Sequence, residues 1–391
     1  MNNKIKEIVL SIIFITFLFS FMIVNILKKD DDISYSERRK LEKRPKITYN
    51  SLIDGTYFNT LDKYTTDQFI GRDSFRKIKI NIDLLTKNNY NNLYLYNDYI
   101  IEELYPINKE SVLNVTKKIN DIKNRYLNET NNIFYSIVPD KNYFVNDDNL
   151  KLDYNELKSI MNTNLNIEYI DIFNELSLED YYKTDTHWKE ERLEKVVNKL
   201  SSKMNFKINN DYSFKEISEF NGTYSSRIIK KNISDKIYIL DNNINALVYN
   251  YESDKYEDIY DLNKLNSLDK YNVYLNGSVS LLKIINNEYD ESKKDLIVFR
   301  DSYGSSLIPL LIDGYNSITV VDIRYIKSSM LKDYIDFNNK DVLFLYSTFL
   351  IHASFTLKSI EISIFIYKKR GYSKPLTISL NSSPLSSNLA Y

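Results

Sequence analysis

The chain has 391 residues, enough for one large hydrophobic core or two smaller ones. Its 52 Lys and Arg against 53 Asp and Glu give a net charge of −1. This balance argues against a nucleic-acid-binding protein, for which a basic face or a high pI is expected. There is no Cys, so disulfides, zinc–thiolate sites and cysteine nucleophiles are excluded.

An uncharged apolar stretch lies near the amino terminus, between Ile8 and Leu27. A stretch of this length crosses a bilayer as a helix, and no small-residue cleavage site of the kind that ends a signal peptide follows it. We predict an uncleaved single-pass anchor in residues 1–29, with a buried helix of a soluble core as the weaker alternative. More Lys and Arg follow the stretch than precede it, and this count alone would keep the following domain in the cytoplasm. Long domains translocate largely regardless of such charge, so the count does not decide the orientation.

Two predicted helices follow a polar linker. Residues 30–56 are polar and basic and read as a juxtamembrane linker. Apolar residues then recur at helical spacing over 57–85, where Gly71 divides the pattern into two helices. Residues 93–101 form a short apolar strand or hairpin.

Helices and strands then alternate along the chain. The apolar patterns predict strands over 132–138, 167–173, 296–299, 318–321 and 342–346, and helices over 111–126, 154–161, 189–204, 305–312 and 328–334. Short, unbroken apolar strands that alternate with helices indicate a parallel sheet covered on both faces. We therefore expect an α/β domain with a doubly wound parallel sheet over residues 57–367.

Two segments depart from this alternation. Residues 205–290 contain β-like pieces at 237–240, 246–251 and 273–275, and we interpret them as a β-rich insertion that flanks the site. Residues 368–391 have no periodicity and are rich in Ser and Asn, which is typical of a poorly ordered tail.

The residues most suggestive of chemistry are Asp185, His187 and Ser302. His187 is one of only two histidines and lies in the pentapeptide Thr-Asp-Thr-His-Trp at 184–188. An Asp-x-His spacing in an extended loop puts both side chains on one side of the backbone. Ser302 follows an apolar strand and precedes a helix, where nucleophiles of α/β proteins stand. A serine nucleophile needs a base, and the base needs a third group that orients it, so we predict a Ser302–His187–Asp185 triad.

Other interpretations remain open. Asp-x-His is common by chance, and the run Asp-Ser-Tyr-Gly at 301–304 could be a turn that caps a helix. A metal site is the weaker alternative, because the only other histidine is His352 and no Cys is present. We expect no metal. No Gly-x-Gly-x-x-Gly or Gly-Lys-Ser/Thr loop occurs, so we also expect no nucleotide cofactor.

The two loops together resemble a known family. Thr-Asp-Thr-His-Trp at 184–188, followed by Arg-Asp-Ser-Tyr-Gly at 300–304, is similar to the bacterial DHHW proteins and their relatives, the alginate O-acetyltransferases with an SGNH-hydrolase-like domain. Further segments in the family's order lie at 36–41 with Pro45, 67–69 with 72–73, 138–141, 220–223 and 322–325. The resemblance, over residues 34–350, implies an SGNH-hydrolase-like fold and assigns the triad roles to Asp185, His187 and Ser302. Thr186 replaces the first His of Asp-His-His-Trp, so any separate role of that His is absent.

The resemblance also implies a location and partners. It implies an extracytoplasmic domain, which the stretch between Ile8 and Leu27 would hold at the cell membrane, and a polysaccharide acceptor. Members of the family often work with a membrane-bound O-acyltransferase that supplies acetyl groups. Three hypotheses follow: an O-acetyltransferase of a cell-surface or secreted polysaccharide, a carbohydrate esterase with the same triad, and a non-catalytic surface protein that binds or scaffolds glycans.

Four residues near the triad are candidate substrate contacts: Arg300, Arg324, Tyr303 and Trp188. The two arginines follow predicted strands and would bind an anionic sugar or pair with neighbouring aspartates, and pairing is slightly favoured. Trp188 would stack on a sugar ring or, more in keeping with its position, pack against the first turn of its helix. The backbone at 221–222 or 276–277 would supply a second oxyanion donor, although two ordinary turns explain these glycines equally well.

Overall fold

The computed structural model describes residues 3–34, 36–37, 39–146, 148–209, 211–228, 233–242 and 244–357. Two compact units are present, one formed by Met1–Leu95 with Tyr224–Asn232 and the other by Tyr96–Thr223 with Ile233–Tyr391. The predicted limits of the anchor, linker and catalytic domain at residues 29, 56 and 367 remain predictions. The predicted tail, 368–391, lies outside the described residues.

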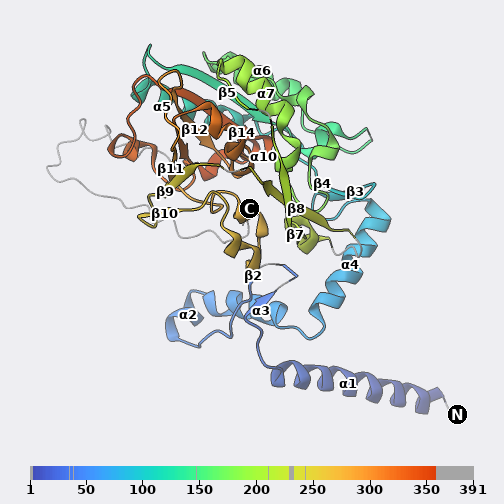
Figure 1. Cartoon of the computed structure of the whole chain (residues 1–391). Helices are drawn as coiled ribbons and strands as arrows, with labels where there is room; N and C mark the ends of the chain where they lie inside the picture. Colours follow the sequence, from blue (N-terminus) through green and yellow to red (C-terminus); the bar gives the residue numbers. More distant parts are fainter. Residues whose placement is uncertain are drawn as a thin grey trace, which may run out of the picture. The chain divides into compact units, whose positions relative to one another are not determined.

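The first unit begins with α1 (Asn3–Leu27), drawn in dark blue in Figure 1. Among the described helices, α1 alone is long and apolar enough to cross a membrane or to act as a signal sequence, over Lys4–Leu27. Nearly all the apolar side chains of this stretch are exposed, as they would be in a helix that faces lipid.

The rest of the first unit is made of short elements. They are β1 (Ile33–Ser34), β2 (Arg39–Lys40), α2 (Tyr49–Ile53), α3 (Thr56–Asp67) and α4 (Arg72–Lys87). Gly71 separates α3 from α4 with a left-handed φ of 71°, as its place in the helical pattern predicts. Along the chain, the division between the units falls within β3 (Leu93–Tyr96) and within α8 (Thr223–Arg227), and β4 (Tyr99–Glu102) belongs to the second unit.

The second unit is built on an eight-stranded mixed sheet with the order β10-β9-β11-β13-β12-β14-β5-β6. Its strands are β5 (Asn132–Val138), β6 (Glu168–Tyr169), β9 (Ala246–Asn250), β10 (Lys255–Glu257), β11 (Leu281–Asn286), β12 (Asp295–Arg300), β13 (Ser317–Val321) and β14 (Asp341–Ser347). From β13 to β6 the strands run parallel, while β11, β9 and β10 add to the sheet antiparallel.

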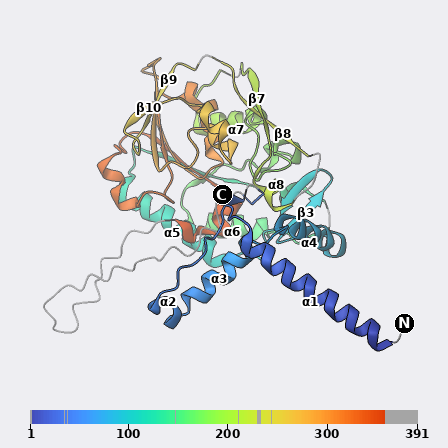
Figure 2. The same cartoon turned by 90° about the horizontal axis from the view of Figure 1, so that it is seen from below.

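The antiparallel strands come from residues 205–290, which the sequence presents as a β-rich insertion. The large sheet is therefore mixed rather than wholly parallel, because this segment completes one side of it. Two further strands of the segment, β7 (Phe214–Phe220) and β8 (Asp235–Leu240), pair only with each other and lie side by side in Figure 2.

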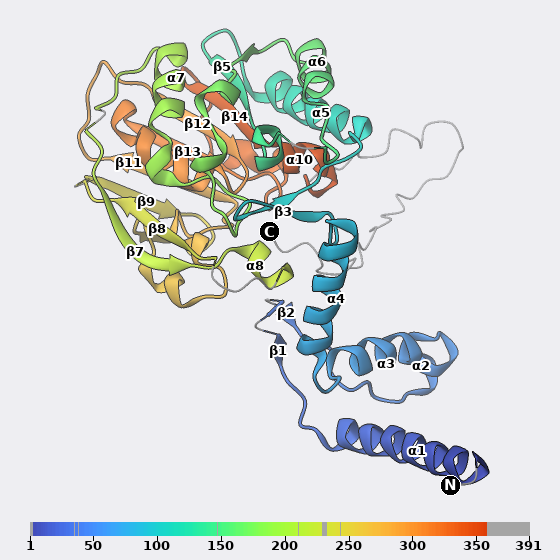
Figure 3. The ribbon, with the colours of Figure 1, turned by 90° about the vertical axis from the view of Figure 1, so that its right-hand side faces the viewer.

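Both faces of the sheet are buried, as expected for an α/β fold. On β12, Leu296 and Val298 belong to one apolar core, and Ile297 and Phe299 belong to the other, because alternate side chains of a strand point to opposite faces. The first core contains residues of α7 (Glu194–Met204), and the second contains residues of α5 (Lys109–Tyr126) and α6 (Tyr154–Asn164). Figure 3 shows α7 on one side of β12 and β14 and α5 and α6 on the other.

Some predicted elements are shorter or of another type. The strand expected over 167–173 is only β6, because the Asp171 carboxylate accepts the Phe173 N–H at 3.0 Å and the chain turns there. The helix expected over 328–334 is a 3-10 helix, Ser328–Asp333. The β-like piece at 273–275 is not a strand, since Leu275 and Asn276 adopt left-handed φ values of 48° and 58°.

Candidate active site

Ser302 lies at the carboxyl end of a central strand. After β12 ends at Arg300, the chain turns and enters α9 (Gly304–Leu307). The carboxylate of Asp301 fixes this turn, since it accepts the N–H of Tyr303 at 3.1 Å and the N–H and hydroxyl of Ser347, from the end of β14, at 2.8 and 2.6 Å. The turn leaves Ser302 half-buried between strand and helix.

The structure brings Asp185, His187 and Ser302 together. His187 Nε2 lies 2.8 Å from Ser302 Oγ, and His187 Nδ1 lies 2.6 Å from Asp185 Oδ1. Burial alone would raise the pKa of Asp185, but the adjacent imidazole and the N–H groups of Thr223 and His187 outweigh it and hold the pKa below its usual range. An ionised Asp185 keeps the proton on Nδ1, so that Nε2 can accept the proton of the serine hydroxyl.

The second oxygen of Asp185 is held from another segment. Thr223 donates to Asp185 Oδ2 from its N–H at 2.7 Å and from its hydroxyl at 3.0 Å. The neighbouring Gly222 packs so closely that a Cβ there would overlap Asp185 Cβ and lie 2.5 Å from the carbonyl oxygen of Thr184. A glycine is therefore required for this segment to reach the loop that carries Asp185.

The loop that carries Asp185 is fixed by a buried carboxylate on β8. Asp235 accepts the N–H groups of Lys183 and Thr184, each at 2.8 Å, and the Thr184 hydroxyl at 2.6 Å. The same hydroxyl accepts the N–H of Gly222 at 2.8 Å. Asp235 thus links the loop at 183–185 with the segment that contacts Asp185 from the other side.

Replacing Asp235 with Ala should impair the site without touching the triad. Two buried N–H groups would lose their acceptor, at a cost of about 1–3 kcal/mol each, and the loop would no longer hold Asp185. We expect the rate at which Ser302 reacts with an activated ester to fall about 10–100-fold. Intact-protein mass spectrometry against time measures this rate. The control is Asp241→Ala, which changes an exposed residue next to the same strand; equal rates for both variants would contradict the prediction.

The imidazole of His187 is enclosed by aromatic rings. Tyr271 stacks on it with ring centroids 3.8 Å apart and an interplanar angle of 10°, and the Tyr303 ring lies 4.8 Å away. The Tyr271 hydroxyl is 2.8 Å from Ser306 Oγ, on the short helix that follows Ser302. These contacts fix the ring plane of His187 and keep water from its faces.

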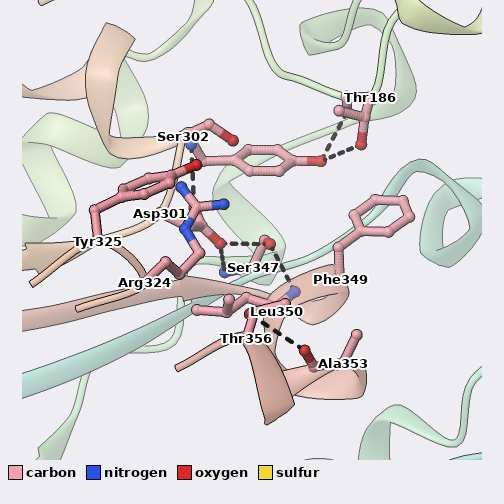
Figure 4. Close-up of a pocket in the computed structure, with 11 residues that line it drawn as sticks. Thr186, Asp301, Ser302, Arg324, Tyr325, Ser347, Phe349, Leu350, Ala353 and Thr356 are labelled. Carbon is pink, nitrogen blue, oxygen red and sulfur yellow. Dashed lines mark hydrogen bonds between the residues drawn. The ribbon is translucent and has the colours of Figure 1, made fainter. Parts of the chain in front are cut away.

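A cavity of about 240 Å³ opens beside Ser302. Its walls include Thr186, Arg324, Tyr325, Phe349 and Leu350. Figure 4 shows these side chains around Asp301 and Ser347, with Tyr325 and Phe349 on opposite sides of the view. The cavity is mostly apolar, with the serine hydroxyl at its edge.

Arg300 and Arg324 are both close to the Asp322 carboxylate. Arg324 donates to it at 2.6 and 2.9 Å and lines the cavity. Arg300 is fully buried, donates to the Gly277 carbonyl at 3.0 Å and lies 3.5 Å from Asp322. Burial lowers the pKa of Arg300. Of these two predicted substrate contacts, the structure places only Arg324 at the cavity and surrounds Arg300 with protein.

Trp188 and Tyr303 have internal hydrogen-bond partners. The indole N–H of Trp188, which is fully buried, donates to the Tyr303 carbonyl at 2.9 Å. The Tyr303 hydroxyl donates to the Thr186 carbonyl at 2.8 Å, and one side of Tyr303 lines the cavity. Trp188 therefore joins the histidine loop to the serine turn by packing, while Tyr303 contributes to the cavity wall.

The glycines considered as second oxyanion donors have N–H groups with other partners. The Gly222 N–H donates to Thr184 Oγ1 at 2.8 Å, and the Gly277 N–H donates to the Tyr274 carbonyl at 3.0 Å. Within the residues that the structure describes, no group of three or more His, Cys, Asp and Glu side chains is arranged to hold a metal ion.

A buried lysine contacts the start of the loop that carries Asp185 and His187. The Lys141 ammonium donates to the carbonyls of Tyr182 and Lys183 at 3.0 and 3.4 Å. Burial lowers its pKa to about 7, whereas an unfolded lysine has a pKa near 10.4. Between these values the unfolded chain binds one proton that the folded chain does not.

Stability should therefore rise with pH through this window and fall as pH approaches 7. The slope attributed to Lys141 is at most about 1.4 kcal/mol per pH unit. Urea unfolding at pH 7.5, 8.5 and 9.5 measures it as the difference between the wild type and Lys141→Met. This range lies above the titration of Asp140, whose pKa burial raises to about 6. Parallel stability curves for the two proteins would refute the prediction.

Three residues of the site were not assigned a role from the sequence: Thr223, Asp235 and Tyr271. Thr223 ends the Phe-Asn-Gly-Thr segment at 220–223, so a motif marked its position but not its contact with Asp185. Nothing in the local sequence distinguishes Asp235, or Tyr271 among 34 tyrosines.

Comparisons with known proteins found relatives in structure only. No protein-family model and no curated protein matches the chain. A DHHW family protein from Eubacterium siraeum DSM 15702 superposes with a TM-score of 0.56 at 19% identity, over 68% of this chain and 93% of that chain. Bacillus cereus PatB1 with a sulfonyl adduct gives 0.55 at 16% identity, over 68% and 98%. The fold is thus shared with a DHHW family protein, as the motifs predict.

A looser neighbour is the O-acetyltransferase domain of Pseudomonas putida AlgJ. Its TM-score is 0.42 at 12% identity, over 70% of this chain and 95% of that chain. A likeness this low supports no argument about fold or function.

Proposed function

We propose that the chain is an O-acetyltransferase with an SGNH-like catalytic domain that uses Ser302, His187 and Asp185 to move acetyl groups onto a polysaccharide. The observation that carries the proposal is the hydrogen-bonded series Asp185–His187–Ser302, with distances of 2.6 and 2.8 Å, at the edge of a cavity. Two fold neighbours add support: one belongs to the DHHW family, and the other, PatB1, forms a sulfonyl adduct.

The proposed reaction has two steps. In the first, Ser302 Oγ attacks the carbonyl carbon of an acetyl ester while His187 Nε2 takes the hydroxyl proton. The donor's alcohol leaves with that proton, and Ser302 is acetylated. In the second, His187 takes the proton of an acceptor hydroxyl, whose oxygen attacks the acetyl carbon, and Ser302 is released with its proton restored. Asp185 stabilises the imidazolium in both steps.

The cavity favours a carbohydrate acceptor over water. Tyr325 and Phe349 offer aromatic faces beside the serine, and the apolar faces of sugar rings pack against such rings. An esterase would use the same two steps with water as the acceptor, so that alternative differs only in how well the cavity holds the sugar and excludes water. A glycan-binding protein without catalysis would not need the triad geometry.

The proposal includes a location and a supplier of acetyl groups. α1 would anchor the chain in the cell membrane with the catalytic unit outside the cytoplasm, and a membrane-bound O-acyltransferase would deliver the acetyl group. The length and apolar character of α1 support the membrane span. The extracytoplasmic orientation and the supply of acetyl groups follow from the family resemblance.

A transfer assay tests the proposed function. The full chain in detergent is given an activated acetyl ester with and without oligosaccharides, and mass spectrometry follows acetyl-Ser302, acetylated oligosaccharide and free acetate. We expect the acetyl group on the oligosaccharide. If free acetate is the only product and its amount does not change when oligosaccharides are added, the protein is an esterase rather than a transferase. The glycan-binding protein would be favoured by two results together. The folded protein would form neither acetylated oligosaccharide nor acetate, and its inactivation in cells would leave the acetylation of the cell surface unchanged.

A further inference from the structure

The first unit contains two polar segments that the catalytic site does not use. Residues 36–37 and 39–41 are joined to residues 67–73 by ion pairs and hydrogen bonds that are largely shielded from solvent. Arg39 donates to both carboxylate oxygens of Asp67, at 2.8 and 2.5 Å. Gln68 accepts the Asp31 N–H at 2.9 Å and donates to the Asp31 carbonyl at 3.0 Å. These contacts fix the turn between α3 and α4 to the chain that leaves α1.

The same turn contacts the apolar helix itself. The Phe69 ring packs on Phe21 with centroids 5.1 Å apart. The N–H of Ile70 donates to Asn25 Oδ1 at 2.8 Å. Phe21 and Asn25 lie within the stretch of α1 that is long and apolar enough to cross a membrane. If α1 spans the bilayer, the turn at Phe69 and Ile70 lies at the membrane surface, beside the last turns of the span.

α4 continues from this turn with an exposed apolar stripe. Phe75, Ile78, Ile82 and Leu85 are each more than half exposed, and their spacing of three and four residues places them on one face of the helix. Phe75 also packs on Phe69, with centroids 5.7 Å apart. The stripe is therefore continuous with the ring that contacts α1.

The charges of α4 fit a lipid surface. The helix contains five basic residues and two acidic ones: Arg72, Arg76, Lys77, Lys79 and Lys87, with Asp73 and Asp83. A helix with basic residues on its polar face and large apolar residues on the other binds at the interface of anionic bilayers, with its apolar face among the headgroups and upper acyl chains.

We propose that α4 is an interfacial membrane helix whose stripe, Phe75, Ile78, Ile82 and Leu85, lies in the surface of the anionic leaflet that α1 leaves. The occupant of this face is lipid. The turn at Phe69 and Ile70 sets the depth of the helix, because it is bonded to α1. The chain would then contact the membrane through two elements, the span α1 and the interfacial helix α4, which would lie parallel to the surface.

Tryptophan fluorescence in proteoliposomes tests this. The native Trp188 is the only tryptophan and is fully buried, so it gives a constant background. Ile78→Trp and Ile82→Trp place a reporter on the stripe. As the matched control, Lys87→Trp places one at an exposed position that points away from the stripe, at the end of the same helix. Each full-length variant is reconstituted in phosphatidylcholine–phosphatidylglycerol vesicles with plain or brominated acyl chains.

We expect bromine to reduce the added emission of Ile78→Trp and Ile82→Trp about twofold or more and to leave that of Lys87→Trp nearly unchanged. Circular dichroism shows whether each variant is folded. Two positions on the stripe are used so that the test still stands if one of the two variants does not fold. If bromine quenches Ile78→Trp and Ile82→Trp as weakly as Lys87→Trp, lipid does not cover the stripe and the proposal is wrong. Equal strong quenching at all three positions would overturn it in favour of a fully inserted helix.

Discussion

Replacing Ser302 with alanine should remove covalent modification by a sulfonyl fluoride or an acetyl ester, and reduce turnover about 10³–10⁶-fold. Among the residues that the structure describes, the Ser302 hydroxyl is the hydrogen-bond partner of His187 Nε2, at 2.8 Å, so its removal takes away the group that the imidazole would activate. Intact-protein mass spectrometry after brief exposure to the reagent gives the mass gain, and peptide mapping gives its place.

Ser305→Ala is the matched control. Ser305 is fully buried in the short helix that follows Ser302, and its hydroxyl has no hydrogen-bond partner among the described residues. Its loss should leave labelling unchanged, because a buried hydroxyl without a partner contributes nothing that alanine would remove. Equal labelling of Ser302→Ala and the wild type would eliminate Ser302 as the nucleophile.

Asp185→Asn should be nearly as damaging, with an expected loss of about 10⁴-fold in the rate of Ser302 acylation. The asparagine keeps the volume of the side chain but can present an NH₂ group to Nδ1, which favours the tautomer with its proton on Nε2. In that tautomer His187 cannot accept the serine proton. Loss of the carboxylate also leaves the imidazolium without the buried negative charge that lies 2.6 Å from it.

The matched control is Asp98→Asn. Asp98 lies 3.4 Å from Lys183, at the start of the catalytic loop, in an exposed ion pair that contributes little. We expect its acylation rate to remain within about twofold of the wild type. The mechanism would be contradicted by an Asp185→Asn protein that is acylated as fast as Asp98→Asn.

Much of the sheet could be predicted because its strands are apolar on both faces. The strand expected over 132–138 coincides with β5, and those expected at 296–299 and 342–346 differ from β12 and β14 by one residue at each end. Ser302 could be proposed because a strand followed by a turn and a helix is a local pattern. Asp185 and His187 could be proposed as partners because they are two residues apart.

The contacts that hold the site together could not be predicted, because they join residues far apart in the sequence. Asp235 is separated from Thr184 by 51 positions, and no local pattern links them. Tyr271 reaches His187 only because the chain between β10 and β11 folds over it. The three strands of 205–290 that join the sheet mix buried residues with exposed or half-buried ones, whereas β12, β13 and β14 are buried almost throughout. Their place in the sheet was therefore not visible from their pattern.

The two borders of the eight-stranded sheet have a consequence for self-association. One border is β10, with three residues and a charged side chain at each end, and the other is β6, with only two residues. Unpaired backbone groups on a long apolar border strand serve as a template on which another chain can add a strand and begin to aggregate. Here the apolar strands are all interior, and the borders are too short to guide such pairing. Copies of the chain held at high local density would therefore not pair readily through the borders of this sheet.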